Sequence, residues 1–283
     1  AGKRNSDLAL ERFDPAGNIV WSWIADAGDG GDDWLSAVAV GPGGDVWATG
    51  AVSSAPGYDI VVVRLTSAGV PLWIRILDGT AHGIDVGNSL VVDAAGNTSV
   101  AGSIVVYHLG HLEQDAAIAR WDPAGNLAWV RTYAGTAHSS DSASRIALDP
   151  FGRIVAAGSL IDSVTQRDFA VWCLDTAGNL NWQRTWDGPF SGGDQFGDLV
   201  LDAMGAVWVC GESRETAVGS TVGDLTIASW DSTGAFRWSW RYGGAGLGTE
   251  QSAVCAAITG NKVIVAGSVT EAPGAQPDAL ILK

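Results

Sequence analysis

Hydrophobic and polar residues alternate along the chain in short runs rich in β-branched and aromatic residues, a pattern typical of strands. Four such runs follow one another in the middle of the chain: Ala116–Trp121, Leu127–Tyr133, Ala143–Leu148 and Ile154–Ser159. The strings DPAGN at Asp122 and DPFGR at Asp149 join them, and D-x-x-G is typical of a type I turn followed by a left-handed glycine. Because helical periodicity is absent, the pattern predicts an all-β protein built from hairpins.

The same pattern repeats along the chain with a period of 52 to 56 residues. Each repeat carries a tryptophan in its second run, a glycine 29 residues later and an aspartate in its first run. The tryptophans are Trp21, Trp73, Trp129, Trp182 and Trp238. The glycines are Gly50, Gly102, Gly158, Gly211 and Gly267. The aspartates are Asp7, Asp59, Asp115, Asp168, Asp224 and Asp278.

Five repeats of four strands predict a β-propeller, because closing the sheets into a ring protects their edges. We expect a single domain over 1–283 with five four-stranded antiparallel blades. The repeats span about 7–58, 59–114, 115–167, 168–223 and 224–277, with a closing strand at 278–283.

Both termini supply strands for the closing blade, and they supply copies of the same strand. Leu8–Phe13 and Ala279–Lys283 occupy equivalent repeat positions, so one of them is spare. The C-terminal copy is the more apolar, and we therefore expect it to pair beside Val263–Ser268, with the Trp21 strand outside it. The N-terminal copy would then lie at an edge or on a neighbouring molecule.

Charge excludes two classes of partner. The 283 residues carry a formal net charge of −15, and the lysines are only Lys3, Lys262 and Lys283. A cluster of cations, as nucleic acid or an anionic membrane surface would require, is missing. No apolar run is long enough to insert into a membrane. The chain begins at Ala1 without a secretory hydrophobic segment, so a removed signal or anchor and a trimmed sequence both stay open.

The recurring string W-x-R-x-Y-x-G…D…L-D-x-x-G-x-x-x-x-A-G, best seen in Trp129–Gly158, resembles the bacterial beta-propeller repeat proteins, which are often surface lipoproteins or secreted modules. The resemblance covers roughly Asp7 to Lys283. It implies a propeller and an extracellular, cell-surface or periplasmic location, and it implies no activity. The first and fifth copies depart from the pattern, since Trp23 and Trp240 replace the arginine.

An acid follows every repeat tryptophan by twelve residues, in the loop that enters the predicted inner strand. These acids are Asp33, Asp85, Asp141, Asp194 and Glu250. They are candidate ligand-binding residues at the channel mouth, where converging carboxylates would attract a cation or a cationic ligand. The alternative is a structural one, in which each carboxylate accepts local backbone N–H groups. Because the column recurs in every repeat, the structural interpretation is favoured.

Trp34 could offer a stacking surface for a sugar ring at the same mouth.

Metal sites have weaker candidates. Asp29, Asp32 and Asp33 form a dense acidic loop that could bind calcium, although they lack the spacing of a calcium-binding loop. A solvated acidic loop is the alternative. His108, His111 and Glu113 could hold a metal, but a flexible loop is favoured there. We expect no other cofactor.

Two functions fit this sequence. The first is a non-catalytic binding or protein-interaction module whose ligand is a small molecule, a glycan or a protein. The alternative is a glycan-active enzyme, a glycoside hydrolase or lyase, or a lectin that uses the channel mouth. Catalytic signatures such as G-x-S-x-G and H-E-x-x-H are absent, which favours the non-enzymatic interpretation.

Overall fold

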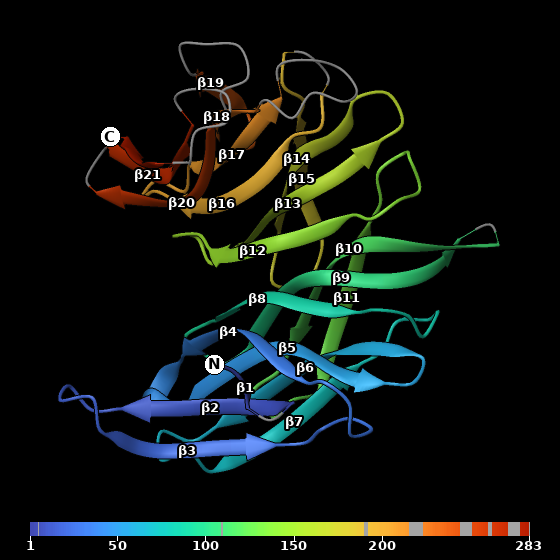
Figure 1. The fold of residues 1–283 in the computed structure, drawn as a ribbon, viewed down its shortest axis with the longest axis vertical. Helices are drawn as coiled ribbons and strands as arrows, with labels where there is room; N and C mark the ends of the chain where they lie inside the picture. Colours follow the sequence, from blue (N-terminus) through green and yellow to red (C-terminus); the bar gives the residue numbers. More distant parts are fainter. Residues whose placement is uncertain are drawn as a thin grey trace. The chain divides into compact units, whose positions relative to one another are not determined.

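The computed structural model describes residues 1–4, 6–108, 110–189, 192–214, 223–243, 251–259, 262–270 and 278–282. Within these residues the chain forms 22 strands and one short 3-10 turn, η1 (Pro42–Gly44). The all-β prediction is therefore confirmed. The strands belong to two compact units, Ala1–Tyr133 and Ala134–Lys283, each with its own sheets (Figure 1).

The first unit holds three antiparallel sheets. The N-terminal sheet has the order β1 (Gly2–Arg4), β2 (Asp7–Phe13), β3 (Ile19–Ala25). The next has the order β4 (Trp34–Val40), β5 (Val46–Ser54), β6 (Gly57–Leu65), β7 (Pro71–Leu77). The last consists of β8 (Val86–Val92), β9 (Thr98–His108), β10 (His111–Trp121) and β11 (Leu127–Tyr133), again in sequential order.

The second unit repeats this arrangement. Its first sheet consists of β12 (Ser142–Leu148), β13 (Ile154–Asp162), β14 (Gln166–Leu174) and β15 (Leu180–Trp186). Its second consists of β16 (Gln195–Leu201), β17 (Val207–Arg214), β18 (Gly223–Trp230) and β19 (Phe236–Tyr242). Its third has three strands, β20 (Gln251–Thr259), β21 (Lys262–Val269) and β22 (Asp278–Leu282).

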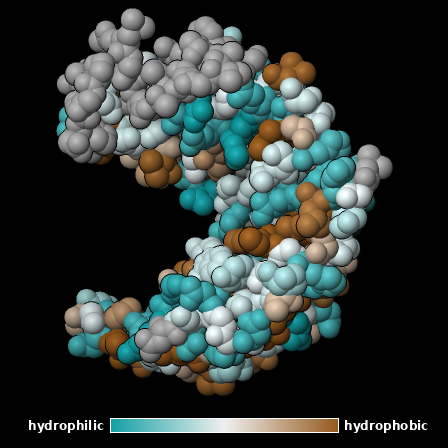
Figure 2. All heavy atoms as spheres, turned by 45° about the vertical axis from the view of Figure 1, so that its right-hand side comes forward, coloured by the Kyte–Doolittle hydropathy of each residue, from teal (hydrophilic) through white to brown (hydrophobic). Residues whose placement is uncertain are grey.

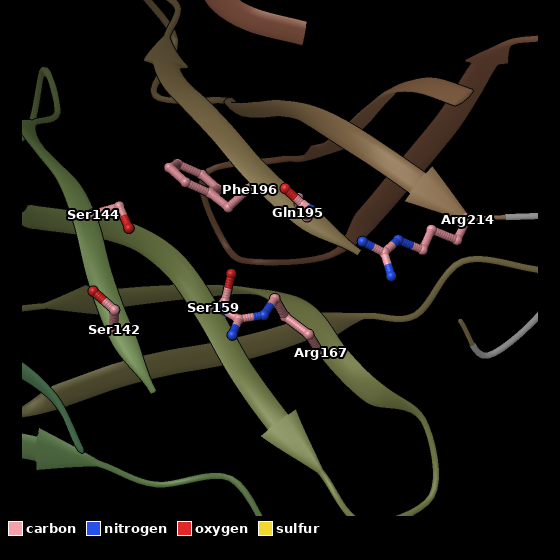
Figure 3. Close-up of a pocket in the computed structure, with 7 residues that line it drawn as sticks. All are labelled: Ser142, Ser144, Ser159, Arg167, Gln195, Phe196 and Arg214. Atoms are coloured by element: carbon pink, nitrogen blue, oxygen red, sulfur yellow. The ribbon is translucent and has the colours of Figure 1, made fainter. Parts of the chain in front are cut away.

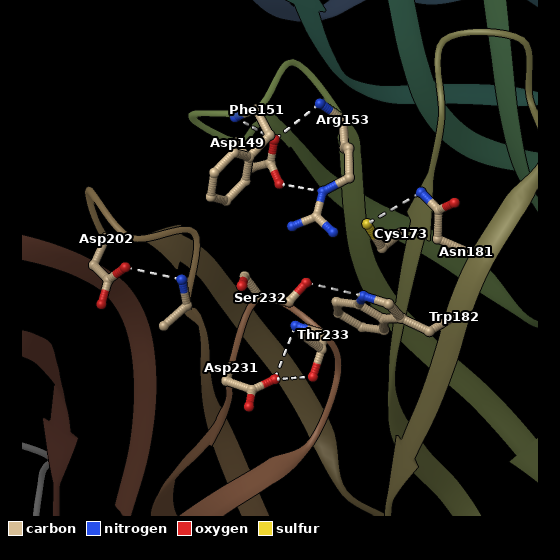
Figure 4. Close-up of polar contacts among 11 residues, drawn as sticks. Asp149, Phe151, Arg153, Cys173, Asn181, Trp182, Asp202, Asp231, Ser232 and Thr233 are labelled. Carbon is tan, nitrogen blue, oxygen red and sulfur yellow. Dashed lines mark hydrogen bonds and ion pairs between the residues drawn. The ribbon is translucent and has the colours of Figure 1, made fainter.

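The D-x-x-G turns form as the sequence predicts. In the turn between β10 and β11, Asp122 Oδ1 accepts hydrogen bonds from the backbone N–H groups of Ala124 at 2.9 Å and Asn126 at 2.8 Å. Gly125 has a φ of +82°, which glycine adopts without strain. Figure 4 shows the equivalent turn at Asp231, whose carboxylate accepts from the N–H and hydroxyl of Thr233.

In both units, a repeat tryptophan in the last strand of one sheet contacts the D-x-x-G turn of the following sheet. Trp73 Nε1 in β7 donates to the carbonyl of Pro123 at 3.2 Å, and Trp182 Nε1 in β15 donates to Ser232 at 3.4 Å (Figure 4). The indole also lies against the glycine of that turn, because a Cβ on Gly234 would meet Trp182 at 2.7 Å. Trp73 and Trp182 therefore pack consecutive sheets of their units together.

An arginine two residues after the tryptophan strengthens the same junction. Arg75 Nε donates to the carbonyl of Gly125 at 2.7 Å, and Arg184 Nε donates to Gly234 at 2.6 Å. The guanidinium groups also lie over the rings of their own tryptophans. The W-x-R part of the repeat therefore encodes contact between sheets.

Each unit has its own hydrophobic core between consecutive sheets. In the first unit, Trp47 and Trp121 are almost fully buried with Ile60, Val62 and Val100. In the second, Trp230 packs with Phe169, Val171 and Val207. On the face shown in Figure 2, hydrophilic and hydrophobic side chains are interspersed. Among the described residues, no helix has the length and hydropathy needed to span a bilayer.

The C-terminal strand occupies the expected position beside β21. Gly267 pairs with Leu280 and Val269 with Asp278, in the same register as Gly50 with Val61 and Val52 with Asp59 in the complete sheet. Strand β22 is therefore a true third strand of its sheet, as the repeat predicts.

The N-terminal strand is not displaced, and here the sequence prediction was wrong. Strand β2 stays paired with β3 and is the central strand of its sheet, between β1 and β3. The short DPAGN turn explains this, since it closes a small loop at little entropic cost. An unexpected strand, β1, covers the other edge of β2, with Gly2 opposite Ala9. As a result, the described residues form four four-stranded sheets and two three-stranded ones.

The contact between tryptophan and glycine can be tested by substitution. Gly234 and Gly152 have similar left-handed backbones, with φ values of +82° and +78°, but nothing lies within 4 Å of a Cβ on Gly152. We expect Gly152→Ala to lower the free energy of unfolding by about 1–2 kcal/mol through backbone strain alone. Gly234→Ala should cost about 1–3 kcal/mol more, because its methyl group overlaps Trp182. Denaturant titration measures both, and equal losses would contradict the proposed role of the indole contact.

Candidate functional site

The acids that follow the repeat tryptophans are buried and bound to the backbone. Asp33, Asp85, Asp141 and Asp194 precede β4, β8, β12 and β16 and are at most 1% exposed. Asp141 accepts hydrogen bonds from the N–H groups of Gly135 and Ile161, both at 2.6 Å. These contacts support the structural interpretation of the column. Glu250 lies outside the described residues.

The equivalent bonds of the other three acids follow the same pattern. Asp33 accepts from Ala27 at 3.1 Å and Ser53 at 2.8 Å. Asp85 accepts from Gly79 and from Val105, the latter at 2.6 Å. Asp194 accepts from Gly188 at 2.8 Å. Each carboxylate thus ties down the loop that leads into its inner strand.

Two of these acids belong to clusters of three carboxylates. In the first unit the cluster is Asp59, Asp78 and Asp85, and in the second it is Asp168, Asp187 and Asp194. Within each cluster, one oxygen from every residue lies within 4.8 Å of the others. The three acids come from the start of the third strand, the loop after the outer strand and the loop before the next inner strand.

Asp78 and Asp187, the second acids of the two clusters, were not among the residues predicted from the sequence. Asp78 and Asp187 both follow their repeat tryptophans by five residues, and Asp26 holds the same position in the first repeat. This spacing was the available signal. Asp7, Asp26 and Asp33 nevertheless form no such cluster within the described part of the chain.

Burial raises the pKa of two acids in each cluster and so favours their protonated forms. It raises the pKa of Asp194 to about 7 and that of Asp168 to about 6, and the negative charge of Asp187 adds to both shifts. Burial also raises the pKa of Asp59 and Asp85, with a contribution from Asp78. Carboxylates that are close together and poorly solvated resist ionisation together.

The calcium candidates of the first acidic loop bind three different partners. Asp29 accepts from the hydroxyl of Ser53, Asp32 pairs with Lys3 Nζ at 3.1 Å, and Asp33 binds the backbone. Among the described residues these three acids form no common cluster. Calcium binding by this loop therefore stays a prediction without a shared centre to support it.

The structure also locates three other candidate residues, Trp34, His108 and His111. Trp34 packs edge-on against Tyr58, with 4.9 Å between the ring centroids, so its ring is partly covered. His108 and His111 do not lie in a flexible loop, which corrects that expectation. They pair across the hairpin of β9 and β10, and Glu113 is buried opposite Val106. Strands β9 and β10 pair over eleven residues each, further than the equivalent strands of the other repeats.

A pocket of about 440 Å³ lies in the second unit, between the sheets that begin with β12 and β16 (Figure 3). Seven residues line it: Ser142, Ser144, Ser159, Arg167, Gln195, Phe196 and Arg214. Ser142 and Gln195 directly follow the column acids Asp141 and Asp194. The pocket therefore lies where the chain enters β12 and β16.

The lining of this pocket is polar and carries positive charge. Arg167 comes from β14 and Arg214 from the end of β17, whereas none of the lining residues is acidic. Within the described chain, Arg167 makes no ion pair, and Arg214 Nε lies 3.8 Å from Glu212. Phe196 is held in place by an edge contact with Phe169. In a protein of net charge −15, such a pocket favours an anionic group.

Comparison with known proteins identifies the fold class. No protein-family model and no curated protein sequence matches the chain. Among solved structures, the periplasmic gluconolactonase PpgL of Pseudomonas aeruginosa has a TM-score of 0.54 and 17% identity, over 96% of this chain and 79% of its own. Sqt1 of Chaetomium thermophilum has a TM-score of 0.56 and 15% identity, over 92% of this chain and 61% of its own.

These likenesses show the fold alone. Both neighbours are propeller-like proteins, and together with the four-stranded antiparallel sheets they support a β-propeller architecture. The chain spans less than two thirds of the length of Sqt1. Membership of the bacterial repeat family stays a prediction.

The buried acids predict a specific pH dependence of stability. A carboxyl group in the unfolded chain has a pKa of about 4, whereas burial raises that of Asp168 to about 6 and that of Asp194 to about 7. The folded state therefore binds more protons between these values, and the stabilisation present below pH 4 is lost as pH rises to about 7. In buffer without divalent cations, the free energy of unfolding should fall from pH 5 to pH 8. Asp168→Asn should flatten this slope, and an unchanged slope would contradict the assignment.

Proposed function

We propose that the protein is a non-catalytic binding module whose pocket in the second unit takes a small anionic ligand, such as a carboxylate-bearing sugar. The observation that carries this proposal is the pair Arg167 and Arg214, which line one polar pocket free of acids. A location outside the cytoplasm, at the cell surface or in the periplasm, is proposed on the family resemblance.

The lining chemistry suits such a ligand. An arginine offers a planar fork of donors that matches a carboxylate or a sulfate. The serine hydroxyls and the Gln195 amide both donate and accept hydrogen bonds, as sugar hydroxyl groups require. Phe196 adds an apolar surface against which a sugar ring can pack.

A glycan-active enzyme is the alternative, and the pocket gives it less support. Glycoside hydrolysis usually requires two carboxyl groups on either side of the scissile bond. Asp168 and Asp194 have raised pKa values but are only 5% and 0% exposed, so a substrate cannot reach them. Likeness to the gluconolactonase concerns the fold and brings no catalytic residue with it.

We propose further that the ring has five blades, the fifth being closed by strands from both termini. The sheet of β20, β21 and β22 has the first three strands of a blade and lacks the outer one. Strand β3 is an outer strand, because Leu8 pairs with Ala25 in the same register as Ile60 with Leu77. Our proposal assigns these two sheets, those of β3 and β22, together to the fifth blade.

The ligand proposal can be tested by titration calorimetry with uronic acid oligosaccharides, matched neutral oligosaccharides and sulfate. We expect the acidic sugars to bind and the neutral ones to bind at least tenfold more weakly. Arg167→Ala and Arg214→Ala should each weaken binding about tenfold or more, the value of a lost charged hydrogen bond.

Arg237→Ala is the matched control, since it removes one positive charge from the same unit but lies over Trp208 and outside the pocket lining. It should leave the affinity unchanged. Equal binding of neutral and acidic sugars, or equal losses in all three variants, would contradict the proposal.

A further inference from the structure

The acid cluster of the second unit joins three separate segments of the chain. Asp168 begins the inner part of β14, Asp187 follows β15, and Asp194 precedes β16. The backbone N–H of Asp194 donates to the carbonyl of Arg167 at 2.6 Å, which fixes the first and third segments together. One carboxylate oxygen from each residue lies within 4.8 Å of the other two.

Two of these carboxylates keep an oxygen without a well-formed hydrogen bond despite their burial. Asp168 Oδ2 accepts from the hydroxyl of Thr165 at 2.6 Å, but its Oδ1 is buried and has no partner. Asp194 Oδ2 accepts from Gly188, and its Oδ1 is buried without a well-formed hydrogen bond, the Ser213 hydroxyl being the donor nearby that lowers the pKa of this acid. A buried acceptor left without a donor costs about 1–3 kcal/mol, so the cluster requires an explanation.

Within the part of the chain that the structure describes, two of the three acids have no positively charged partner. Neither Asp168 nor Asp194 has a lysine or arginine within ion-pair distance among the described residues. The next repeat shows a different solution. There Gly243 replaces the middle acid, and Asp224, the equivalent of Asp168, is paired with Arg241 from β19. In this repeat, which has Gly243 at the position of Asp187, the side chain of Arg241 supplies the positive charge that neutralises Asp224.

We propose that Asp168, Asp187 and Asp194 bind a divalent metal cation of the calcium type. Calcium binds oxygen ligands at about 2.4 Å, so two ligands on opposite sides of the ion lie about 4.8 Å apart. The spacing of the three carboxylate oxygens fits within this sphere. Asp187 is the most exposed of the three.

Such an ion would act as a clamp between two consecutive sheets. It would tie the end of β15 and the start of β14 to the loop that enters β16. Arg167 and Gln195, which neighbour two of the ligands in sequence, line the pocket proposed for an anionic ligand, but the cation site does not depend on that pocket having a ligand.

The test compares protein freed of metal by chelation with the same protein titrated with calcium chloride. Thermal melting and calorimetry are the two measurements, with magnesium chloride and ionic-strength-matched sodium chloride as comparison salts. We expect calcium to raise the melting temperature and to bind with a measurable heat, whereas sodium chloride should do neither.

Asp187→Asn separates a metal ligand from a merely structural acid. Without metal it should melt at the same temperature as the parent protein or higher, because it relieves repulsion within the cluster. With calcium, its gain in melting temperature should be smaller than that of the parent. Asp168→Asn provides a second variant should the first fail to fold.

Asp202→Asn is the matched control, since it removes one negative charge from an exposed turn of the same unit. It should keep the full calcium response. The proposal is overturned if calcium has no more effect than sodium chloride. It is also overturned if Asp187→Asn keeps the full calcium response, or if it loses no more of that response than the control.

Discussion

The contact on which each unit depends is the one between the repeat tryptophan and the glycine turn of the following sheet. An indole is large and flat, and it can approach a backbone closely only where no Cβ intervenes. Gly125 and Gly234 provide that space beside Trp73 and Trp182, and their left-handed backbones are needed for the turn in any case. One residue thereby satisfies two requirements. Turn geometry within a sheet and packing between sheets are fixed together, which explains why the tryptophan and the D-x-x-G string recur as a set.

The repeat made the architecture largely predictable. Spacing located the strands, the turns and the buried tryptophans, because each repeat presents the same local signals in the same order. The ends were harder to predict. Leu8–Phe13 and Ala279–Lys283 match the same column, and sequence similarity cannot decide between two copies of one strand. In the structure each copy forms a third strand in its own sheet, and β1 adds a pairing that no repeat signal announced.

The candidate site was predictable only in part. The column of Asp85, Asp141 and Asp194 was visible because it recurs in every repeat, and recurrence pointed correctly to loop fixation. The remaining residues follow the repeat less regularly. Asp187 lies in a column that holds Asp26 and Asp78 but also Ala134 and Gly243, so only some of the repeats carry this signal. Arg167 and Arg214 belong to no charged column, and periodicity cannot reveal them. They emerge only when the fold brings separate segments to one place.

Loop fixation and cation binding are compatible roles for one acid. A carboxylate has two oxygens, and in Asp194 one of them holds the loop through Gly188 while the other is buried without a well-formed hydrogen bond. Asp85 has no oxygen left for a cation, because both of its carboxylate oxygens accept backbone hydrogen bonds, from Gly79 and Val105. The two clusters are therefore similar in composition but differ in the acceptors they leave open. Because buried acceptors without partners are costly, the second cluster has the greater need of a cation, and the ion would stabilise the junction that also shapes the pocket beside it.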